Sequence, residues 1–209
     1  MKTKIVFDLG GVVLHWQPTR LLQRELPHLA IDDNTAAQLA GQIFQSYRGD
    51  WGDFDRGAVS VPQLVQRIAR RTGLAARDVQ RVVDGVPAEL QPQPDSVALL
   101  RRLRAAGCEL HYLSNMPAPY ADLLELRNDF FAWFKSGVFS GRVHHNKPEP
   151  AIFALAAQRF GAAPQELLFI DDHLPNVQAA QALGWQAFLF SSAAQAEAEL
   201  RQRGCFVAR

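Results

Sequence analysis

The sequence has little of the features that mark disulfide-bonded or membrane-spanning proteins. Only 2 of its 209 residues are cysteine, with no CxxC or Cys/His spacing, so we expect free thiols in a reducing compartment. No apolar run approaches the ~20 residues that a membrane-spanning helix needs, and the N-terminus lacks the pattern of a signal peptide. We therefore expect a cytoplasmic protein.

An excess of charge of one sign is also missing. The 22 basic and 21 acidic side chains are mixed along the chain and give a formal net charge of +1. This balance creates no field to attract nucleic acid or an anionic membrane, so we expect neither partner. Recognition of an anion must then be local. No apolar surface stripe stands out, so a monomer is the default expectation, with a homodimer left open.

The sequence does contain an alternation of short apolar strands and amphipathic helices. With 48% hydrophobic residues, the chain can bury a full core. Runs rich in β-branched and aromatic residues predict buried strands over 5–7, 109–113, 137–139, 167–170 and 186–190. Apolar spacings of three and four predict helices over 97–106, 121–130, 148–160, 176–183 and 193–203. The alternation predicts an α/β fold with a Rossmann-like parallel sheet, covered on both faces.

One segment interrupts this alternation, because it predicts helices only. They are expected over 20–26, 35–47, 61–72 and 77–86, with 49–52 as a loop and the prolines at 87, 92 and 94 as an extended connector. We therefore predict a core domain of residues 1–16 and 88–209, and an inserted α-helical cap of residues 17–87. An insert directly after the first strand would cover the carboxyl edge of the sheet.

Asp8 ends the first predicted strand at that edge. Gly10 and Gly11 follow it and allow the backbone to turn sharply and to approach a small anion closely. Asp8 is therefore the candidate nucleophile, although a solvated turn aspartate would explain this stretch alone.

Three later segments supply groups that such a nucleophile needs. Ser114 and Asn115 follow the second strand and can hydrogen-bond phosphoryl oxygens. Lys147 precedes a predicted helix, where its charge can balance the nucleophile and a phosphate. Asp171 and Asp172 end another strand and repel each other unless a cation compensates, and such hard oxygen ligands suit Mg²⁺.

In order and sequence, these segments resemble the haloacid dehalogenase-like hydrolase superfamily over essentially the whole chain. Residues 7–12 resemble its motif I, 113–115 motif II, 147–148 motif III, and 169–172 with 176–180 motif IV. The insert is similar to the helical C1 cap of subfamily I, which includes sugar-phosphate phosphatases, the phosphatase domain of epoxide hydrolases and 2-haloacid dehalogenases. Within it, residues 51–57 resemble the "F-x-x-G" stretch often seen there.

The resemblance implies a Mg²⁺-dependent phosphatase that hydrolyses a small phosphorylated metabolite, such as a sugar phosphate. Asp8 would attack phosphorus in line and form an aspartyl-phosphate, which water then hydrolyses, while Lys147 balances the charge. The phosphate would be held by Ser114, Asn115 and the amides of Leu9, Gly10 and Gly11. The metal ligands would be Asp8, the Gly10 carbonyl and Asp172, with Asp171 and Asn176 in support.

The chain departs from most phosphatases of the superfamily at Gly10, where they carry a second Asp as general acid and base. His15, His173 and the pair His144–His145 are open candidates for this role. Dehalogenases also lack the second Asp, so a metal-independent 2-haloacid dehalogenase is one alternative, against which the paired motif IV acids argue. A catalytically weak member that binds a phosphorylated ligand or a protein is another.

Aromatic and basic residues of the insert leave the substrate open. Trp16, Trp51 and Phe54 either form a core inside the cap or line the crevice, where they would favour a flat, partly apolar substrate. In the second case Arg48 and Arg56 could contact a second anionic group.

Overall fold

The computed structural model describes residues 3–205 and contains the expected parallel sheet. Its strands are β1 (Lys4–Phe7), β2 (Leu110–Ser114), β3 (Ser136–Phe139), β4 (Leu167–Asp171) and β5 (Gln186–Leu189). All neighbouring strands pair in parallel, in the order β3-β2-β1-β4-β5. Each strand lies within one residue of its predicted bounds, because short β-branched and aromatic runs identify buried parallel strands well. The predicted α/β fold is confirmed.

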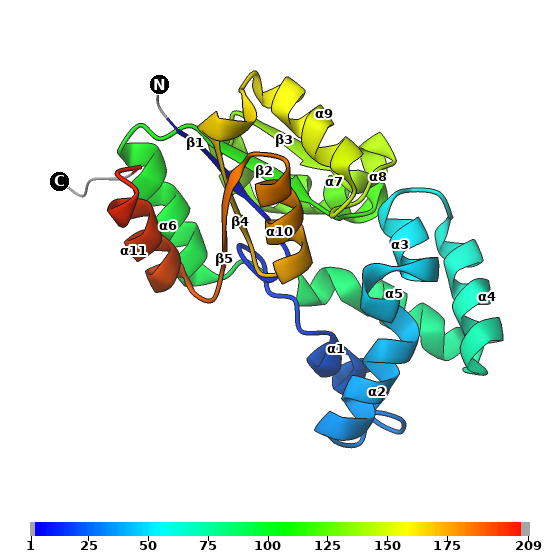
Figure 1. Ribbon diagram of the computed structural model, residues 1–209. Helices are drawn as coiled ribbons and strands as arrows, with labels where there is room; N and C mark the ends of the chain where they lie inside the picture. The colour runs from blue at the N-terminus through cyan, green and yellow to red at the C-terminus, as the bar shows by residue number, and fades with distance from the viewer. Residues whose placement is uncertain (1–2, 206–209) are drawn as a thin grey trace.

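Helices cover both faces of this sheet (Figure 1). On one face, α9 (Pro150–Phe160) contacts β3, and α10 (Leu174–Ala182) contacts β4 and β5. Val6, Leu113 and Phe169 point into this layer. Their neighbours along the strands join the larger core on the other side, with α6 (Pro94–Ala105), α7 (Ala118–Arg127) and α11 (Ala193–Gln202). Strand side chains alternate between the faces, so a strand buried on both faces needs apolar residues at nearly every position.

The strand order creates a crevice at the carboxyl edge of β1 and β4. From β1 the chain moves to β2 and β3 on one side of the sheet, and then crosses to β4 and β5 on the other. Open α/β sheets bind ligands at such a switch point, where the connections that follow two neighbouring strands diverge. Asp8 follows β1 and Asp171 ends β4, so the topology brings these two carboxylates together.

The segment between β1 and α6 is helical, as predicted. It forms α1 (Pro18–Glu25), α2 (Asp33–Phe44), α3 (Gly49–Asp55), α4 (Val61–Thr72) and α5 (Ala76–Glu89), which lie together beyond the carboxyl edge of the sheet (Figure 1). The segment that leads into the insert and the segment that leads out of it run side by side. The His15 amide donates to the Gln91 carbonyl, and the Gln93 amide donates to the Val13 carbonyl, both over 2.8 Å. The domain boundaries at 16/17 and 87/88 remain a prediction.

The expected loop at 49–52 was wrong. These residues open α3, because Trp51 and Phe54 are buried on one helix face, with ring centroids 5.9 Å apart. The loop instead precedes them, at Gln45–Tyr47, where φ is 49°, 51° and 62° at three successive non-glycine residues. Such backbone is sparsely populated and is typical of functional loops.

Pro87 does not begin an extended connector either, since it lies inside α5. Proline lacks the amide that would bond the carbonyl four residues earlier, which here belongs to Val83. That carbonyl accepts a hydrogen bond from the Tyr120 hydroxyl over 2.8 Å. A side chain of α7 therefore replaces the missing helix bond, which local sequence could not reveal.

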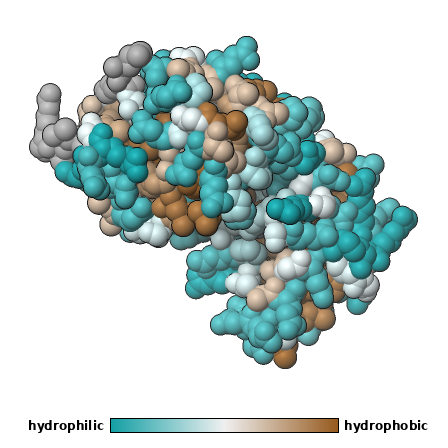
Figure 2. All heavy atoms as spheres, viewed as in Figure 1, coloured by the Kyte–Doolittle hydropathy of each residue, from teal (hydrophilic) through white to brown (hydrophobic). Residues whose placement is uncertain are grey.

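The visible surface is largely hydrophilic, with hydrophobic residues in smaller groups (Figure 2). In the described chain the exposed large hydrophobic residues are Leu29, Ile31, Leu126, Leu174, Leu183 and Leu189. Among residues 3–205, none of the helices is sufficiently long and apolar to span a membrane. Monomeric state and cellular location remain predictions.

Candidate active site

Lys147 lies between two carboxylates at the switch point. Its Nζ is 2.9 Å from Asp8 Oδ1 and 2.7 Å from Asp171 Oδ2, and its side chain is 1% exposed. Burial alone would lower the pKa of Lys147, but the charges of Asp171 and Asp8 outweigh burial and raise it. The lysine therefore carries a fixed positive charge next to the candidate nucleophile.

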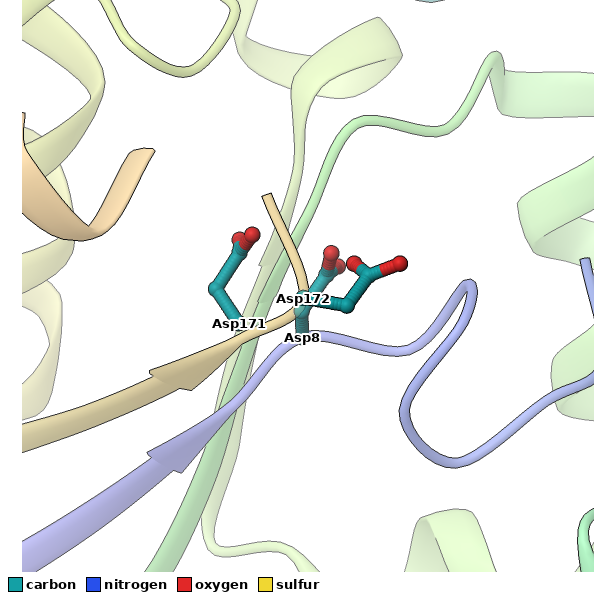
Figure 3. A group of neighbouring side chains, drawn as sticks. All are labelled: Asp8, Asp171 and Asp172. Atoms are coloured by element: carbon teal, nitrogen blue, oxygen red, sulfur yellow. The ribbon is translucent and has the colours of Figure 1, made fainter. Parts of the chain in front are cut away.

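Three carboxylates converge at this edge. Asp8 comes from the end of β1, and Asp171 and Asp172 come from the end of β4, with their carboxyl groups on the same side (Figure 3). One oxygen of each lies within 4.8 Å of the others. Burial raises the pKa of Asp8 despite the opposing charge of Lys147, and the neighbouring acids raise it further. A cation would favour the ionised form that a nucleophile needs.

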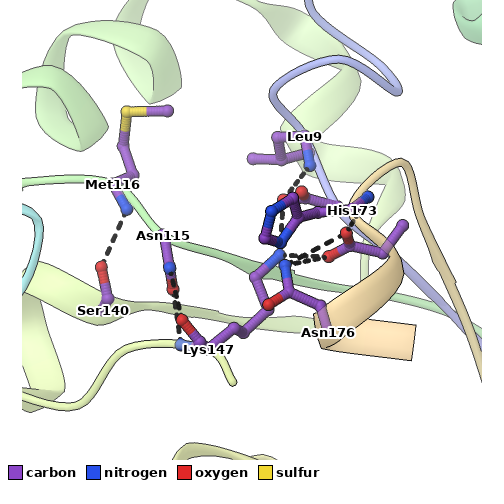
Figure 4. A network of polar contacts seen from close by, with 9 residues as sticks. Leu9, Asn115, Met116, Ser140, Lys147, His173 and Asn176 are labelled. Atoms are coloured by element: carbon purple, nitrogen blue, oxygen red, sulfur yellow. Dashed lines mark hydrogen bonds and ion pairs between the residues drawn. The ribbon is translucent and has the colours of Figure 1, made fainter. Parts of the chain in front are cut away.

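The two motif IV acids have different surroundings. Asp171 is fully buried and accepts hydrogen bonds from the His173 amide over 2.7 Å and from Asn176 Nδ2 over 3.1 Å, besides its pair with Lys147 (Figure 4). Asp172 is exposed, and within residues 3–205 no other residue donates a hydrogen bond to its carboxylate. Although Asp172 reaches solvent, the surrounding protein removes part of the water around its carboxylate, and this desolvation and the charge of Asp171 raise the pKa of Asp172. Asp171 therefore positions Lys147 and Asn176, whereas Asp172 is available for a ligand.

The carboxylate set fits Mg²⁺, which takes oxygen ligands and retains several waters. Asp8 and Asp172 offer oxygens at short mutual distance, and Gly11 makes room for one of them. A Cβ atom at Gly11 would lie 2.1 Å from Asp172 Oδ2, and φ there is +76°. Gly10 has no such constraint, because the nearest atom to its Cβ position is Trp16 Cβ at 3.9 Å.

Some of the predicted phosphate-binding residues line the cavity, and others have their amides bonded within the protein. Ser114 and Gly10 line the cavity above Asp8. The Leu9 amide donates to Asp8 Oδ1 over 2.7 Å, and the Gly11 amide donates to the Leu14 carbonyl over 2.9 Å. Both amides thus have partners within the protein, and they shape the motif I turn.

Asn115 also lines the cavity, but its side chain holds the lysine loop. Its Nδ2 donates to the Lys147 carbonyl over 2.9 Å, and its Oδ1 accepts from the Lys147 amide over 2.8 Å (Figure 4). These two hydrogen bonds join the two loops and fix the backbone of Lys147, which carries the buried Nζ. The described geometry gives Asn115 a positioning role, and contact with phosphate remains a prediction.

The cavity has about 650 Å³ and lies between the sheet edge and the insert. Its apolar walls include Trp16, Trp51, Val86, Leu90, Met116 and Tyr120. Gln45, Ser46 and Arg48 add polar groups from the strained loop and its neighbour. Trp51 is 3% exposed, so it belongs to the packed core of the insert and to the cavity wall at once. Trp51 therefore both packs in the core of the insert and lines the crevice, the two positions that the sequence left open.

The histidines that sequence left open differ in position. His173 lines the cavity, with its ring 6.2 Å from that of Tyr47. His15 is outside the cavity wall, and His145 lies 3.7 Å from Glu149. His144 Nδ1 is 3.0 Å from the Arg56 carbonyl, so its ring contacts the insert.

Sequence reasoning missed Asp55, the last residue of α3. It is 4% exposed and lines the same cavity as Asp8 and Lys147. Burial raises the pKa of Asp55 to about 8. A signal was present: Trp51, Phe54 and Asp55 stand at the i, i+3 and i+4 positions of one helix face, and an acid on an apolar face requires explanation.

Comparison with known proteins gives a consistent picture. The family described as haloacid dehalogenase-like hydrolase matches residues 4–184. The sesquiterpene phosphatase astK of Aspergillus oryzae is 27% identical over 203 residues, which cover 96% of each chain. Among solved structures, a HAD family enzyme from Bacteroides thetaiotaomicron in complex with magnesium and inorganic phosphate has a TM-score of 0.71 and 21% identity, covering 92% of this chain and 96% of its own.

An L-2-haloacid dehalogenase, RSc1362, also has a similar structure. Its TM-score is 0.70 at 19% identity, over 90% of this chain and 86% of its own. At such identities both structures show a shared fold, and the chemistry must be argued from the site.

Proposed function

This chain belongs to the haloacid dehalogenase-like hydrolase family, and from that premise we propose that it is a Mg²⁺-dependent phosphatase acting through an aspartyl-phosphate at Asp8. The observation that carries the proposal is the pairing of Asp8 with Lys147 beside two further carboxylates. An anionic nucleophile needs such charge balance to approach an anionic phosphate. The astK relative, a phosphatase by name, supports the same reaction class.

The protein groups around Asp8 favour one oxygen for attack. The Leu9 amide and Lys147 Nζ both approach Oδ1. Oδ2 has no protein donor within residues 3–205, so we assign the attack on phosphorus to it. Lys147 then faces the nucleophile and the incoming phosphoryl group, and Ser114 offers a hydroxyl to a phosphoryl oxygen.

Mg²⁺, held by Asp8, Asp172 and the Gly10 carbonyl with Asp171 and Asn176 in support, would neutralise the charge that builds up as nucleophile and phosphate meet. A metal-independent dehalogenase is the second candidate, because Gly10 removes the usual acid and dehalogenases share the fold. A metal-independent dehalogenase gives no role in the reaction to the exposed Asp172, which lies beside Asp8 and Asp171. The phosphatase explains all three carboxylates.

The cavity walls favour an alcohol with a largely apolar body over a sugar. The six apolar side chains named above line the cavity beside the polar groups of the site, and they can pack against an apolar body, whereas a sugar needs hydrogen-bond partners for each buried hydroxyl. A cavity of about 650 Å³ is large enough for a small-molecule ester. The name of the astK relative, a sesquiterpene phosphatase, agrees with an apolar substrate.

Phosphate release tests the proposal directly. p-Nitrophenyl phosphate should be hydrolysed with Mg²⁺, and excess EDTA should abolish the reaction. Among natural types of ester, an isoprenyl or alkyl phosphate should show a higher kcat/KM than a hexose phosphate. Phosphate release that persists in EDTA would reject the Mg²⁺ dependence, and halide release from a 2-haloacid without phosphatase activity would reject the phosphatase.

A further inference from the structure

We infer that Asp55 is the acid and base that Gly10 does not supply: its carboxyl group protonates the leaving alcohol and then activates the attacking water. This role rests on the proposed phosphatase function. Asp55 lines the cavity from the insert, whereas Asp8 and Lys147 line it from the sheet edge. A phosphate ester bound between them therefore meets a nucleophile on the core and a carboxyl group on the insert.

The end of α3 is fastened to the core by side chains that bond its backbone. The carbonyl of the last residue of a helix, here Asp55, lacks an intrahelical partner, whereas the Gly52 carbonyl already accepts from the Arg56 amide. Here Ser140 Oγ donates to the Asp55 carbonyl over 2.6 Å, and Asn146 Nδ2 donates to the Gly52 carbonyl over 2.7 Å. Ser140 is fully buried and also accepts from the Met116 amide over 2.8 Å. The position of Asp55 is thus fixed relative to the core.

The same connection reaches the catalytic lysine. Asn146 directly precedes Lys147 in the chain, so one loop both carries the buried ammonium group and holds α3. Just beyond the helix end, a Cβ atom at Gly57 would lie 2.7 Å from the carbonyl of Gly141, the residue after Ser140. The insert therefore approaches the core closely where Asp55 stands, and the two catalytic groups share a rigid support.

The environment keeps a proton on Asp55 at neutral pH. Burial raises the pKa of this carboxyl group to about 8, against the opposing charges of Lys147 and Arg56. The charge of Asp8 raises it further. The titratable and charged groups that face Asp55 are Lys147, Asp8, Arg56, Tyr47 and Tyr120. A protonated acid near the working pH is what a general acid requires.

The proton balance closes over the two steps. In the first, Asp8 forms a bond to phosphorus, the bond from phosphorus to the alcohol oxygen breaks, and the proton of Asp55 moves to that oxygen. In the second, the Asp55 carboxylate takes a proton from water as the water oxygen attacks phosphorus. The phosphorus bond to Asp8 breaks, and inorganic phosphate leaves with Asp8 ionised and Asp55 protonated again.

Leaving-group dependence distinguishes this role from a structural one. We compare Asp55→Asn with Asp53→Asn, an acid on the same helix whose side chain is 41% exposed and pairs with Arg67. With Mg²⁺, Asp55→Asn should lose about 10²- to 10⁴-fold in kcat/KM on hexyl phosphate, whose alkoxide leaves poorly. It should lose about tenfold or less on p-nitrophenyl phosphate, which needs little acid assistance. Asp53→Asn should match the wild type on both.

Two further readouts test the inference, and the first, in the wild type, does not depend on the folding of Asp55→Asn. In the wild type, kcat/KM for hexyl phosphate should fall as pH rises through about 8, because the acid loses its proton, while p-nitrophenyl phosphate shows a weaker fall. Adding Gly10→Asp to Asp55→Asn should restore part of the hexyl phosphate activity, since space is open at Gly10.

Equal losses on both esters, or no loss on either, would overturn the role of Asp55. If His173→Gln, and not Asp55→Asn, loses far more activity on hexyl phosphate than on p-nitrophenyl phosphate, the role belongs to that histidine. A folded wild type that hydrolyses neither ester would instead overturn the phosphatase function, and the acid role with it.

Discussion

Gly11 and Asp172 are in such close contact that a single methyl group cannot fit between them. A Cβ atom at Gly11 would lie 2.1 Å from Asp172 Oδ2, far inside van der Waals contact. The glycine in motif I therefore makes room for the carboxylate of motif IV, although the two residues lie in loops that follow different strands of the sheet. The backbone of the turn after β1 thus limits where the Asp172 carboxylate, in the loop after β4, can lie.

Gly11→Ala should weaken Mg²⁺ binding by about 10- to 100-fold, the usual effect of displacing a metal-ligand support. Mg²⁺ titration by calorimetry and by phosphatase activity would measure it. Gly73→Ala is the matched control, because Gly73 has the same φ of +76° and nothing within 4 Å of its Cβ position. Equal Mg²⁺ affinity in Gly11→Ala and the wild type would contradict this account of the glycine.

Ser140→Ala should destabilise the protein by about 1–3 kcal/mol, because it leaves the Met116 amide and the Asp55 carbonyl without their partner. Urea unfolding gives the free energy, and amide hydrogen exchange should show faster exchange at the end of α3. Ser191→Ala, at an exposed site, is the control. Unchanged exchange in α3 would mean that Ser140 does not fasten the insert.

The sequence predicted residues that follow strand ends better than residues whose position depends on packing between segments. Asp8 and Asp171 come together because the carboxyl ends of neighbouring parallel strands meet at one edge, and Lys147 reaches this edge from the connection between β3 and α9. Asp55 could not be placed in the same way. The first residues of its helix, 49–52, were expected to form a loop, and its position depends on the docking of α3 against Ser140 and Asn146.

Glu109 provides a prediction on stability and pH, remote from the cavity. Burial opposes its ionisation, but hydrogen bonds from Lys135, His111 and Lys4 prevail and lower its pKa from 4.5 to about 2. A depressed pKa stabilises the folded state above the unfolded pKa, and this contribution is lost as pH falls from about 4.5 toward 2. Glu109→Gln should therefore cost about 1 kcal/mol at pH 7, the scale of a partly exposed ion pair, and less at pH 3.

Urea unfolding of Glu109→Gln and the wild type at the two pH values measures this difference. Glu166→Gln removes a half-buried acid directly before β4 and keeps an oxygen that can accept from the Ala163 amide, so it controls for the general loss of negative charge. A destabilisation that is the same at pH 7 and pH 3 would show that the ionised carboxylate is not the stabilising group.

Capture of the covalent intermediate tests the central claim most directly. After rapid acid quench of the reaction with hexyl phosphate and Mg²⁺, mass spectrometry should find one phosphoryl group on the peptide that contains Asp8. The adduct should be absent from Asp8→Asn, which should stay folded and inactive. Turnover without a phosphorylated peptide, an adduct on another residue, or full activity in Asp8→Asn would contradict the account.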